Sequence, residues 1–287
     1  MSAESSKPVG RRRVGVGLAR YLEAFRSPKG LVSLILIAIL FLLAFLAPVI
    51  FPGGFDAQSR DSLLPPSLTH PFGTDELGRD IFARTFFGLR TDLTLVLAAV
   101  PLSMILGSML GLIGYVSDRL GNAVQRGLDV IVGFPSLILG ISLVLVLGTG
   151  WWSIFATIVI VGLPTFGRLA RSSLLTQQNR EYVLAARTLG IGKWTVMVRH
   201  IAPNALDVII VQAAVFLVHS VFLEAGLSIV GLGIQPPEPS LGTLLNTGIR
   251  FIIQSPTYIL GPTLVLIVLA LSFSLLADSL NERVNRR

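Results

Sequence analysis

Long apolar runs dominate the chain from residue 30 onward, and shorter polar stretches separate them. A helix needs roughly 20 residues to cross a hydrocarbon layer about 30 Å thick, and six of the runs come close to this length or exceed it. They lie at 30–51, 92–116, 127–148, 152–169, 207–232 and 259–278. They lack the strict alternation of membrane-barrel strands. The pattern therefore predicts an all-α polytopic membrane protein with six transmembrane helices.

The first apolar run follows a basic N-terminal stretch, an arrangement that cleaved signal peptides also have. The run Leu31–Ile50 is 20 residues long, whereas the apolar core of a signal peptide usually has about 7–15 residues. We therefore expect the run to be retained as the first membrane helix.

Lysine and arginine are distributed unevenly among the segments between the runs. Of the 23 basic residues, 18 lie at the N-terminus, between runs two and three, between runs four and five (counting Arg168 at the inner edge of run four), or after the last run. Cytoplasmic segments of membrane proteins carry such an excess, so both termini are expected in the cytoplasm. The predicted order is a cytoplasmic segment 1–29, a first helix 30–51, an external loop 52–91, a five-helix core 92–278 with a cytoplasmic loop 170–206, and a cytoplasmic tail 279–287.

Composition agrees with a membrane protein. The chain is 52% hydrophobic and only 14% charged, against about 25% charged residues in soluble domains. Its net charge of +7 does not indicate nucleic-acid binding, because the basic residues are divided among loops and form no patch with interleaved aromatic residues. The absence of cysteine excludes disulfides, thiolate metal sites and cysteine nucleophiles.

Proline and glycine within the runs indicate a packed bundle. Pro101, Pro135 and Pro164 interrupt apolar segments, and a membrane helix tolerates proline when its neighbours satisfy the freed carbonyl group. Gly107 and Gly111 form a small-xxx-small face that allows a second helix to approach closely.

A helical period marks the loop 170–206. Apolar residues recur at i, i+3, i+4 and i+7, namely at Tyr182, Ala185, Ala186 and Leu189. Gly190 is expected to end this helix, and Lys193–His200 is expected to form a second short helix before Pro203. The apolar stripe has no partner within the loop. Its mixed charges favour a groove on a soluble protein over a lipid surface.

The same loop resembles the signature of the membrane subunits of bacterial binding-protein-dependent ABC importers. That signature is Glu-Ala-Ala, three residues, Gly, nine residues, Ile, one residue, Leu-Pro. Ala185, Ala186, Gly190 and Pro203 keep its spacing, whereas Leu184, His200 and Ala202 depart from it. YVLAARTLG from Tyr182 and RHIAPN up to Asn204 are similar to the dipeptide, oligopeptide and nickel branch.

Three further stretches resemble the C-type permease subunits of that branch. They are HPFGTDELGRD at 70–80, EAGLSIVGLGIQPP at 224–237, and the region of Asp278, where Ala277 stands in place of the usual Gly. The resemblance covers nearly the whole chain from Leu31 onward.

This resemblance implies a type I ABC importer permease fold in a bacterial cytoplasmic membrane. It implies a homologous second permease, two ATP-binding subunits that hold ATP and Mg, and an extracytoplasmic substrate-binding protein. The chain would form half of a pathway for di- or oligopeptides, and the loop 181–203 would couple it to one ATPase. The coupling residues implied by the match are Glu181, Tyr182, Ala185, Ala186, Arg187, Gly190, Pro203 and Asn204.

Besides Asp207 at its first position, two ionisable residues lie within the fifth run. Such groups are costly in a membrane unless they face water or partners, so His219 and Glu224 are either on the substrate path or in packing contacts. They are about 140° apart on a helix and are not a natural pair. With His70 and His200 elsewhere in the chain, they predict no metal site. The 70–80 stretch could either contact the binding protein or cap the bundle.

Motifs for catalysis and nucleotide binding are missing. Gly190-Ile-Gly192-Lys193 looks like part of a phosphate loop, but Arg187 and Trp194 stand where the Walker motif needs Gly and Ser or Thr. No Gly-x-Ser-x-Gly or His-Glu-x-x-His motif occurs. The chain is expected to hold no cofactor and not to be an enzyme. The alternative is a self-contained secondary transporter or channel, for which inverted repeats would be the sign; no internal duplication is evident.

Overall fold

Helices make up nearly all the regular structure of the computed structural model, which describes residues 25–285. Within this range the only β-type pairing is an isolated bridge between Thr74 and Asp80. The prediction of an all-α fold is confirmed. Most of the expected cytoplasmic segment 1–29 lies outside the described residues.

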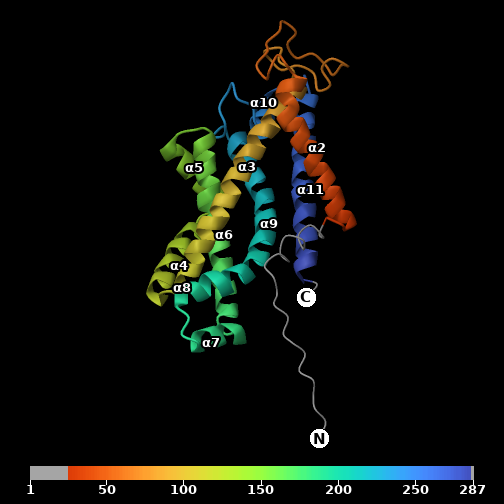
Figure 1. The fold of residues 1–287 in the computed structure, drawn as a ribbon. Helices are drawn as coiled ribbons and strands as arrows, with labels where there is room; N and C mark the ends of the chain where they lie inside the picture. Colours follow the sequence, from red (N-terminus) through yellow and green to blue (C-terminus); the bar gives the residue numbers. More distant parts are fainter. Residues whose placement is uncertain (1–24, 286–287) are drawn as a thin grey trace.

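Five single helices in the described range are long and apolar enough to cross a membrane, and a bent pair of helices makes a sixth candidate. The single helices are α2 (Pro28–Ile50), α3 (Ile81–Leu112), α6 (Trp151–Gln177), α9 (Ala202–Ile229) and α11 (Thr257–Asn285). The bent pair is α4 (Asp118–Val132) and α5 (Ser136–Leu147). Figure 1 shows them as one elongated bundle.

Helix α3 begins eleven residues before the predicted start of the second run. Asp80 is its N-cap, and the Asp80 Oδ1 atom accepts a hydrogen bond from the Phe82 N–H at 2.9 Å. Burial raises the pKa of the Asp80 carboxyl group. The N-terminal part of α3 contains Arg84 and Asp92, both buried. Because these residues are charged, a search for apolar runs does not recognise this part of the helix. The polar loop is therefore 52–80, shorter than predicted.

The third predicted run is divided into two helices that meet at 93°. Helix α4 ends at Val132, and Pro135 stands at the N-cap of α5. Proline has no N–H to continue the helix and disfavours helical geometry in the residue before it. The proline expected to interrupt this run therefore bends it sharply.

Helices α6 and α9 extend beyond the apolar runs that predicted them. Helix α6 continues to Gln177 and α9 begins at Ala202. In the extension of α6, Ala170 and Leu174 are fully buried. Packing against neighbouring helices stabilises turns that are too polar to be recognised as a membrane span.

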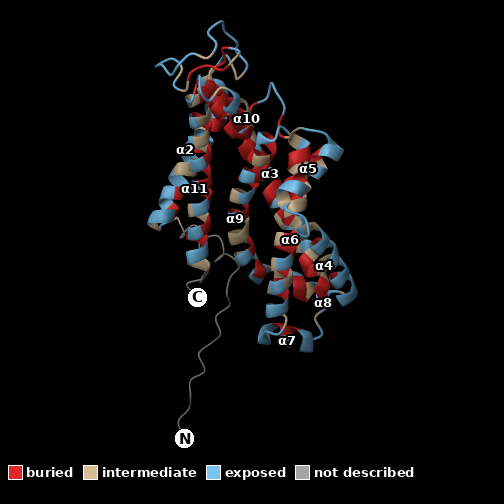
Figure 2. Ribbon diagram, turned by 180° about the vertical axis from the view of Figure 1, so that it is seen from behind, coloured by how far each residue is buried: buried red, intermediate tan, exposed pale blue. Residues whose placement is uncertain are grey.

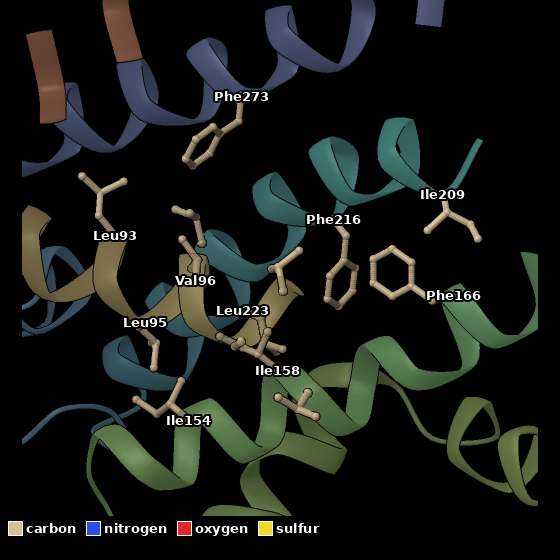
Figure 3. Close-up of a cluster of buried hydrophobic side chains, with 14 of the residues drawn as sticks. Leu93, Leu95, Val96, Ile154, Ile158, Phe166, Ile209, Phe216, Leu223 and Phe273 are labelled. Carbon is tan, nitrogen blue, oxygen red and sulfur yellow. The ribbon is translucent and has the colours of Figure 1, made fainter. Parts of the chain in front are cut away.

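Close helix packing centres on α3 and α6, the pair with the most extensive contact. A Cβ atom on Gly107 would lie 2.7 Å from the Leu163 carbonyl oxygen, and one on Gly111 would lie 2.9 Å from the Ala170 Cβ. The predicted small-residue face is thus the face that meets α6. Figure 3 shows the core beside it, where α3, α6, α9 and α11 all contribute buried side chains, among them Val96, Ile158, Phe216 and Phe273.

The two ends of the bundle differ in what they carry. At one end the start of α2 meets the end of α11, where Ser27 Oγ lies 3.1 Å from Ser279 Oγ and Lys29 Nζ lies 2.6 Å from Glu282 Oε1. The short helix α7 (Glu181–Thr188) projects toward the same side, whereas α10 (Leu241–Arg250) and the loop 52–80 lie at the opposite end (Figure 1). Much of α2 is exposed (Figure 2) despite its apolar side chains, as expected of a surface that faces lipid.

Candidate coupling site and translocation surface

An elbow of two short helices connects α6 to α9. Helix α7 ends at Thr188, and Gly190 has a φ of +74°. The Gly190 N–H donates to the Arg187 carbonyl at 2.9 Å and the Ile191 N–H donates to the Ala186 carbonyl at 3.1 Å. This is a Schellman motif, in which glycine supplies the left-handed residue that ends a helix. Gly190 therefore ends the first helix, as predicted.

The second half of the elbow differs from the prediction. Helix α8 covers Lys193–Val196, a π-helical turn follows at Met197–Ile201, and α9 continues directly from Ala202. Pro203 thus lies in the first turn of α9 and does not end a separate helix before it. Proline is tolerated there because a local π-helical adjustment, here the turn at Met197–Ile201, can satisfy the backbone groups that its missing N–H leaves free. As a consequence, α8 is joined rigidly to the membrane helix α9.

Side-chain hydrogen bonds tie the elbow to the ends of α6 and α9. The Tyr182 hydroxyl donates to Gln177 Oε1 at 2.7 Å and accepts from Asn204 Nδ2 at 3.3 Å. Asn204 Nδ2 also donates to the His200 carbonyl at 2.6 Å. Partial burial raises the pKa of Tyr182, so its hydroxyl keeps the proton that it donates. Tyr182 and Asn204, both predicted coupling residues, hold the three segments together.

A second anchor joins α7 to the end of α3. Arg187 Nε donates to the Tyr115 hydroxyl at 2.9 Å, and its guanidinium carbon lies 5.1 Å from the centre of the Tyr115 ring. A guanidinium group over an aromatic face gains a cation–π attraction. Sequence reasoning identified Arg187 and missed Tyr115, because 72 residues separate the two and no motif connects them.

Several large apolar side chains of the elbow are exposed, next to the exposed charged residues Glu181 and Lys193. Leu189 is 80% exposed, Trp194 is 64% exposed, and Leu184 is also exposed. Of the predicted coupling residues, Glu181 and Ala185 share this surface. Ala186 is buried with Val183 on the opposite side of α7. The elbow therefore presents a small apolar platform on a framework fixed from within.

His219 lines a cavity between the bent pair α4–α5 and helices α6 and α9. The cavity has a volume of about 300 Å³, and its polar lining includes Ser136, Thr165 and Gln212. The His219 ring stacks on Phe216 with 5.4 Å between ring centroids. A mainly apolar cavity with a few polar groups suits a solute that needs a few hydrogen bonds.

Glu224, five residues further along α9, does not line this cavity and is fully buried. Its Oε1 atom accepts a hydrogen bond from the Ser228 hydroxyl at 2.7 Å. The structure thus separates His219 from Glu224, in agreement with their angular offset along the helix. A role on the substrate path stays a prediction for both.

The stretch 70–80 folds down onto the bundle. Asp75 is fully buried, and its Oδ2 atom lies 2.6 Å from Arg79 Nε and 3.6 Å from Arg84 Nε. The Tyr258 hydroxyl at the start of α11 donates to Glu76 Oε2 at 3.1 Å. These contacts make the stretch a cap that connects α3 to α11. Contact of this stretch with a binding protein stays a prediction.

These features define an α-helical membrane protein with a rigid, exposed elbow at one end. The family model described as binding-protein-dependent transport system inner membrane component matches residues 99–287. The chain belongs to this family.

Curated relatives cover nearly the whole chain. The dipeptide transport system permease protein DppC of Alkalihalophilus pseudofirmus is 34% identical over 92% of this chain and 88% of its own length. The oligopeptide transport system permease protein OppC of Bacillus subtilis is 34% identical over 91% of this chain and 87% of its own length. The glutathione transport system permease protein GsiD of Pectobacterium atrosepticum is also 34% identical, over 89% and 85%. The resemblance to the dipeptide and oligopeptide branch is confirmed.

Solved structures support the fold. The inward-facing MetNI methionine ABC transporter has a chain that matches with a TM-score of 0.57 and 19% identity. The match covers 69% of this chain and 95% of that chain. The type I importer permease fold expected from the sequence is therefore confirmed.

Proposed function

We propose that the chain is one of two permease subunits of an ATP-driven importer for di- or oligopeptides in a bacterial cytoplasmic membrane. The names of the relatives support the substrate class, and family membership argues against a self-contained secondary transporter or channel. A homologous permease would complete the pathway, and an extracytoplasmic binding protein would deliver the substrate. ATP and Mg would be held by two ATPase subunits.

The elbow is the proposed docking surface for one ATPase subunit. The observation that carries this proposal is the exposure of Leu189 and Trp194 on a framework fixed by Tyr182, Arg187 and Asn204. Exposed apolar side chains in an aqueous compartment favour burial in a partner's groove. Because α8 continues into α9, a shift of the ATPase would move a membrane helix as a rigid body.

Docking can be tested by placing a charge on the platform. We expect Leu189→Glu to abolish co-purification of the ATPase subunits with the tagged chain, because a buried unpaired carboxylate is costly. The control is Leu68→Glu, at a fully exposed leucine of the loop 52–80, which should retain the ATPase. Retention of the ATPase by both variants would contradict the docking role of the elbow.

The proposed orientation has both termini and the elbow in the cytoplasm. The basic bias supports it, as does the grouping of α7 with the start of α2 and the end of α11 at one end of the bundle. The chain has no cysteine, so single cysteines are clean reporters. A membrane-impermeant thiol reagent should label Leu68→Cys in cells with a permeabilised outer envelope and Leu189→Cys only in inverted vesicles. The reverse pattern would refute the orientation.

The His219 cavity is the proposed part of the substrate path within this chain. Its polar groups offer hydrogen bonds to peptide amides. We expect His219→Ala to change peptide uptake by the reconstituted complex without loss of assembly. Unchanged uptake across di- and oligopeptides would exclude a role for this residue in the path.

A further inference from the structure

A second cavity lies at the end of the bundle that carries α10 and the loop 52–80. It has a volume of about 340 Å³ and is lined by residues of this loop, of α3, of the start of α6 and of the segment before α10. Small-molecule ligands occupy cavities of roughly 300–1,000 Å³, so this cavity suits a small solute. Unlike the His219 cavity, it is lined by charged side chains of both signs, Arg90 and Glu238.

Arg90 supplies the positive group. Its guanidinium carbon lies 5.7 Å from the centre of the Phe45 ring on α2, a cation–π contact that uses none of its N–H donors. Those donors lie in the plane of the guanidinium group and match the two oxygens of a carboxylate or phosphate. Within residues 25–285, the Arg90 side chain makes no ion pair and no hydrogen bond. Its donors are therefore available to a ligand.

Glu238 supplies the negative group from a rigid segment. It stands between Pro237 and Pro239 in the short connection before α10. Proline fixes its own φ and restricts the residue before it, so the backbone at Glu238 has little freedom to move. Glu238 is exposed, and its side chain has no ion pair and no hydrogen bond in the described part of the chain.

Contacts between α3 and α10 hold this segment against α3. The Leu241 N–H, in the first turn of α10, donates to the buried Asp92 Oδ2 atom of α3 at 3.1 Å. One turn earlier on α3, a Cβ atom on Gly88 would lie 2.9 Å from the Ser240 carbonyl carbon. Glycine at this position therefore lets the backbone before α10 lie directly on α3. The two charged groups line one cavity whose walls are fixed relative to each other.

Aromatic rings and a hydroxyl group form other parts of the lining. Phe55 and Phe87 pack edge to face, with 5.4 Å between ring centroids. Trp151, at the start of α6, stacks on Phe155 with 5.2 Å between ring centroids. Thr91 adds a hydroxyl group. Aromatic walls accept an apolar side chain, and charged groups of opposite sign suit the two ends of a zwitterion.

We propose that this cavity is an entry site for zwitterionic peptides, in which Arg90 binds the C-terminal carboxylate and Glu238 binds the N-terminal ammonium group. The inference rests on the proposed function for its substrate class and adds a site that recognises the free ends of a peptide. A peptide with a blocked end loses one of the two charged contacts. A zwitterionic lipid headgroup has the same chemistry, with a phosphate and an ammonium group, and the lipid composition of the assay distinguishes it from a peptide.

Protection of a single cysteine from labelling tests the site. The chain has no cysteine, so Thr91→Cys places one thiol in the lining of the cavity. The complex of permease and ATPase subunits is placed in phosphatidylglycerol nanodiscs without the binding protein and treated with a membrane-impermeant thiol reagent. The dipeptide alanylphenylalanine should slow labelling of Thr91→Cys severalfold and leave labelling of Leu68→Cys, in the loop 52–80, unchanged. The N-acetylated and the C-amidated dipeptide should each need about fivefold higher concentration, because each loses one charged contact at an exposed site.

Variants without one charge assign the two ends of the peptide. In the Thr91→Cys chain, Arg90→Gln should raise the half-protecting concentration of the free dipeptide about fivefold and remove the effect of C-terminal amidation, whereas N-acetylation still weakens protection. Glu238→Gln should give the reciprocal pattern. Arg60→Gln and Asp61→Asn, at exposed charges of the loop 52–80 outside the cavity, should change neither.

Several results would overturn the entry site. They are labelling that the dipeptide does not slow, equal protection by the free and both blocked peptides, slowing by added phosphatidylethanolamine in place of the dipeptide, and protection by the peptide-free binding protein but not by the dipeptide. Uptake by the wild-type complex with its binding protein is measured in parallel. Peptide uptake without protection refutes this site alone, whereas failure to take up any di- or oligopeptide refutes the proposed function.

Discussion

Substitution of Gly190 offers the sharpest test of whether the elbow transmits movement to α9. The free-energy cost of this substitution comes from backbone strain and not from altered packing. A Cβ atom at this position would meet no atom within 4 Å, and the φ of +74° is unfavourable for every residue with a side chain. Gly190→Ser should therefore act through backbone strain alone. A left-handed conformation costs a residue with a Cβ about 1–2 kcal/mol, which lowers the population of the native elbow by roughly 5- to 30-fold.

Gly192 provides the matched control. It is also surrounded by open space, but it is the N-cap of α8 with a φ of −59°. Serine is compatible with this conformation and is favoured as an N-cap, so Gly192→Ser should leave the elbow intact. The same substitution two residues apart thus separates strain from the mere addition of a side chain.

The assay is peptide uptake and peptide-stimulated ATP hydrolysis by the reconstituted complex. We expect Gly190→Ser to reduce both severalfold while membrane insertion of the chain stays at the wild-type level, and Gly192→Ser to match the wild type. Equal activity of the two variants would refute the reasoning, because it would mean that the elbow transmits force without its Schellman turn.

Three further outcomes follow from packing and electrostatics. Gly111→Ala should destabilise the bundle by about 1–3 kcal/mol, measured by thermal unfolding in detergent, whereas Gly127→Ala, which meets only open space, should not. Tyr115→Phe should cost about 0.5–1.5 kcal/mol of elbow stability and Arg187→Met should cost more, because it also removes the cation–π contact; additive effects on uptake in the double variant would contradict a direct contact. Asp75→Asn should destabilise the cap formed by residues 70–80 by about 3–5 kcal/mol, measured as faster proteolysis of the loop 52–80, because it leaves the buried Arg84 guanidinium without a carboxylate and Arg79 with only the more exposed Asp56 and Glu76.

The sequence by itself was enough to predict that the helices of this protein lie in a lipid bilayer and to locate the elbow. Apolar runs of sufficient length leave few alternatives to membrane helices, because an unpaired backbone group in lipid is too costly. The glycine at position 190 predicted the end of α7, because a local conformation that only glycine adopts easily is visible in the sequence. The small face of Gly107 and Gly111 was also visible in the sequence, because residues without a bulky side chain at this spacing allow close helix packing.

Only the tertiary structure decided which polar groups meet. Helix α3 begins at Ile81 and not at residue 92 because Arg84 and Asp92 find partners in other segments. The same applies to the pairing of Arg187 with Tyr115, and of Asp92 with the Leu241 N–H at the start of α10. Hydrophobic period is a local property that a sequence displays directly, whereas the compensation of a buried charge depends on residues brought together from distant parts of the chain.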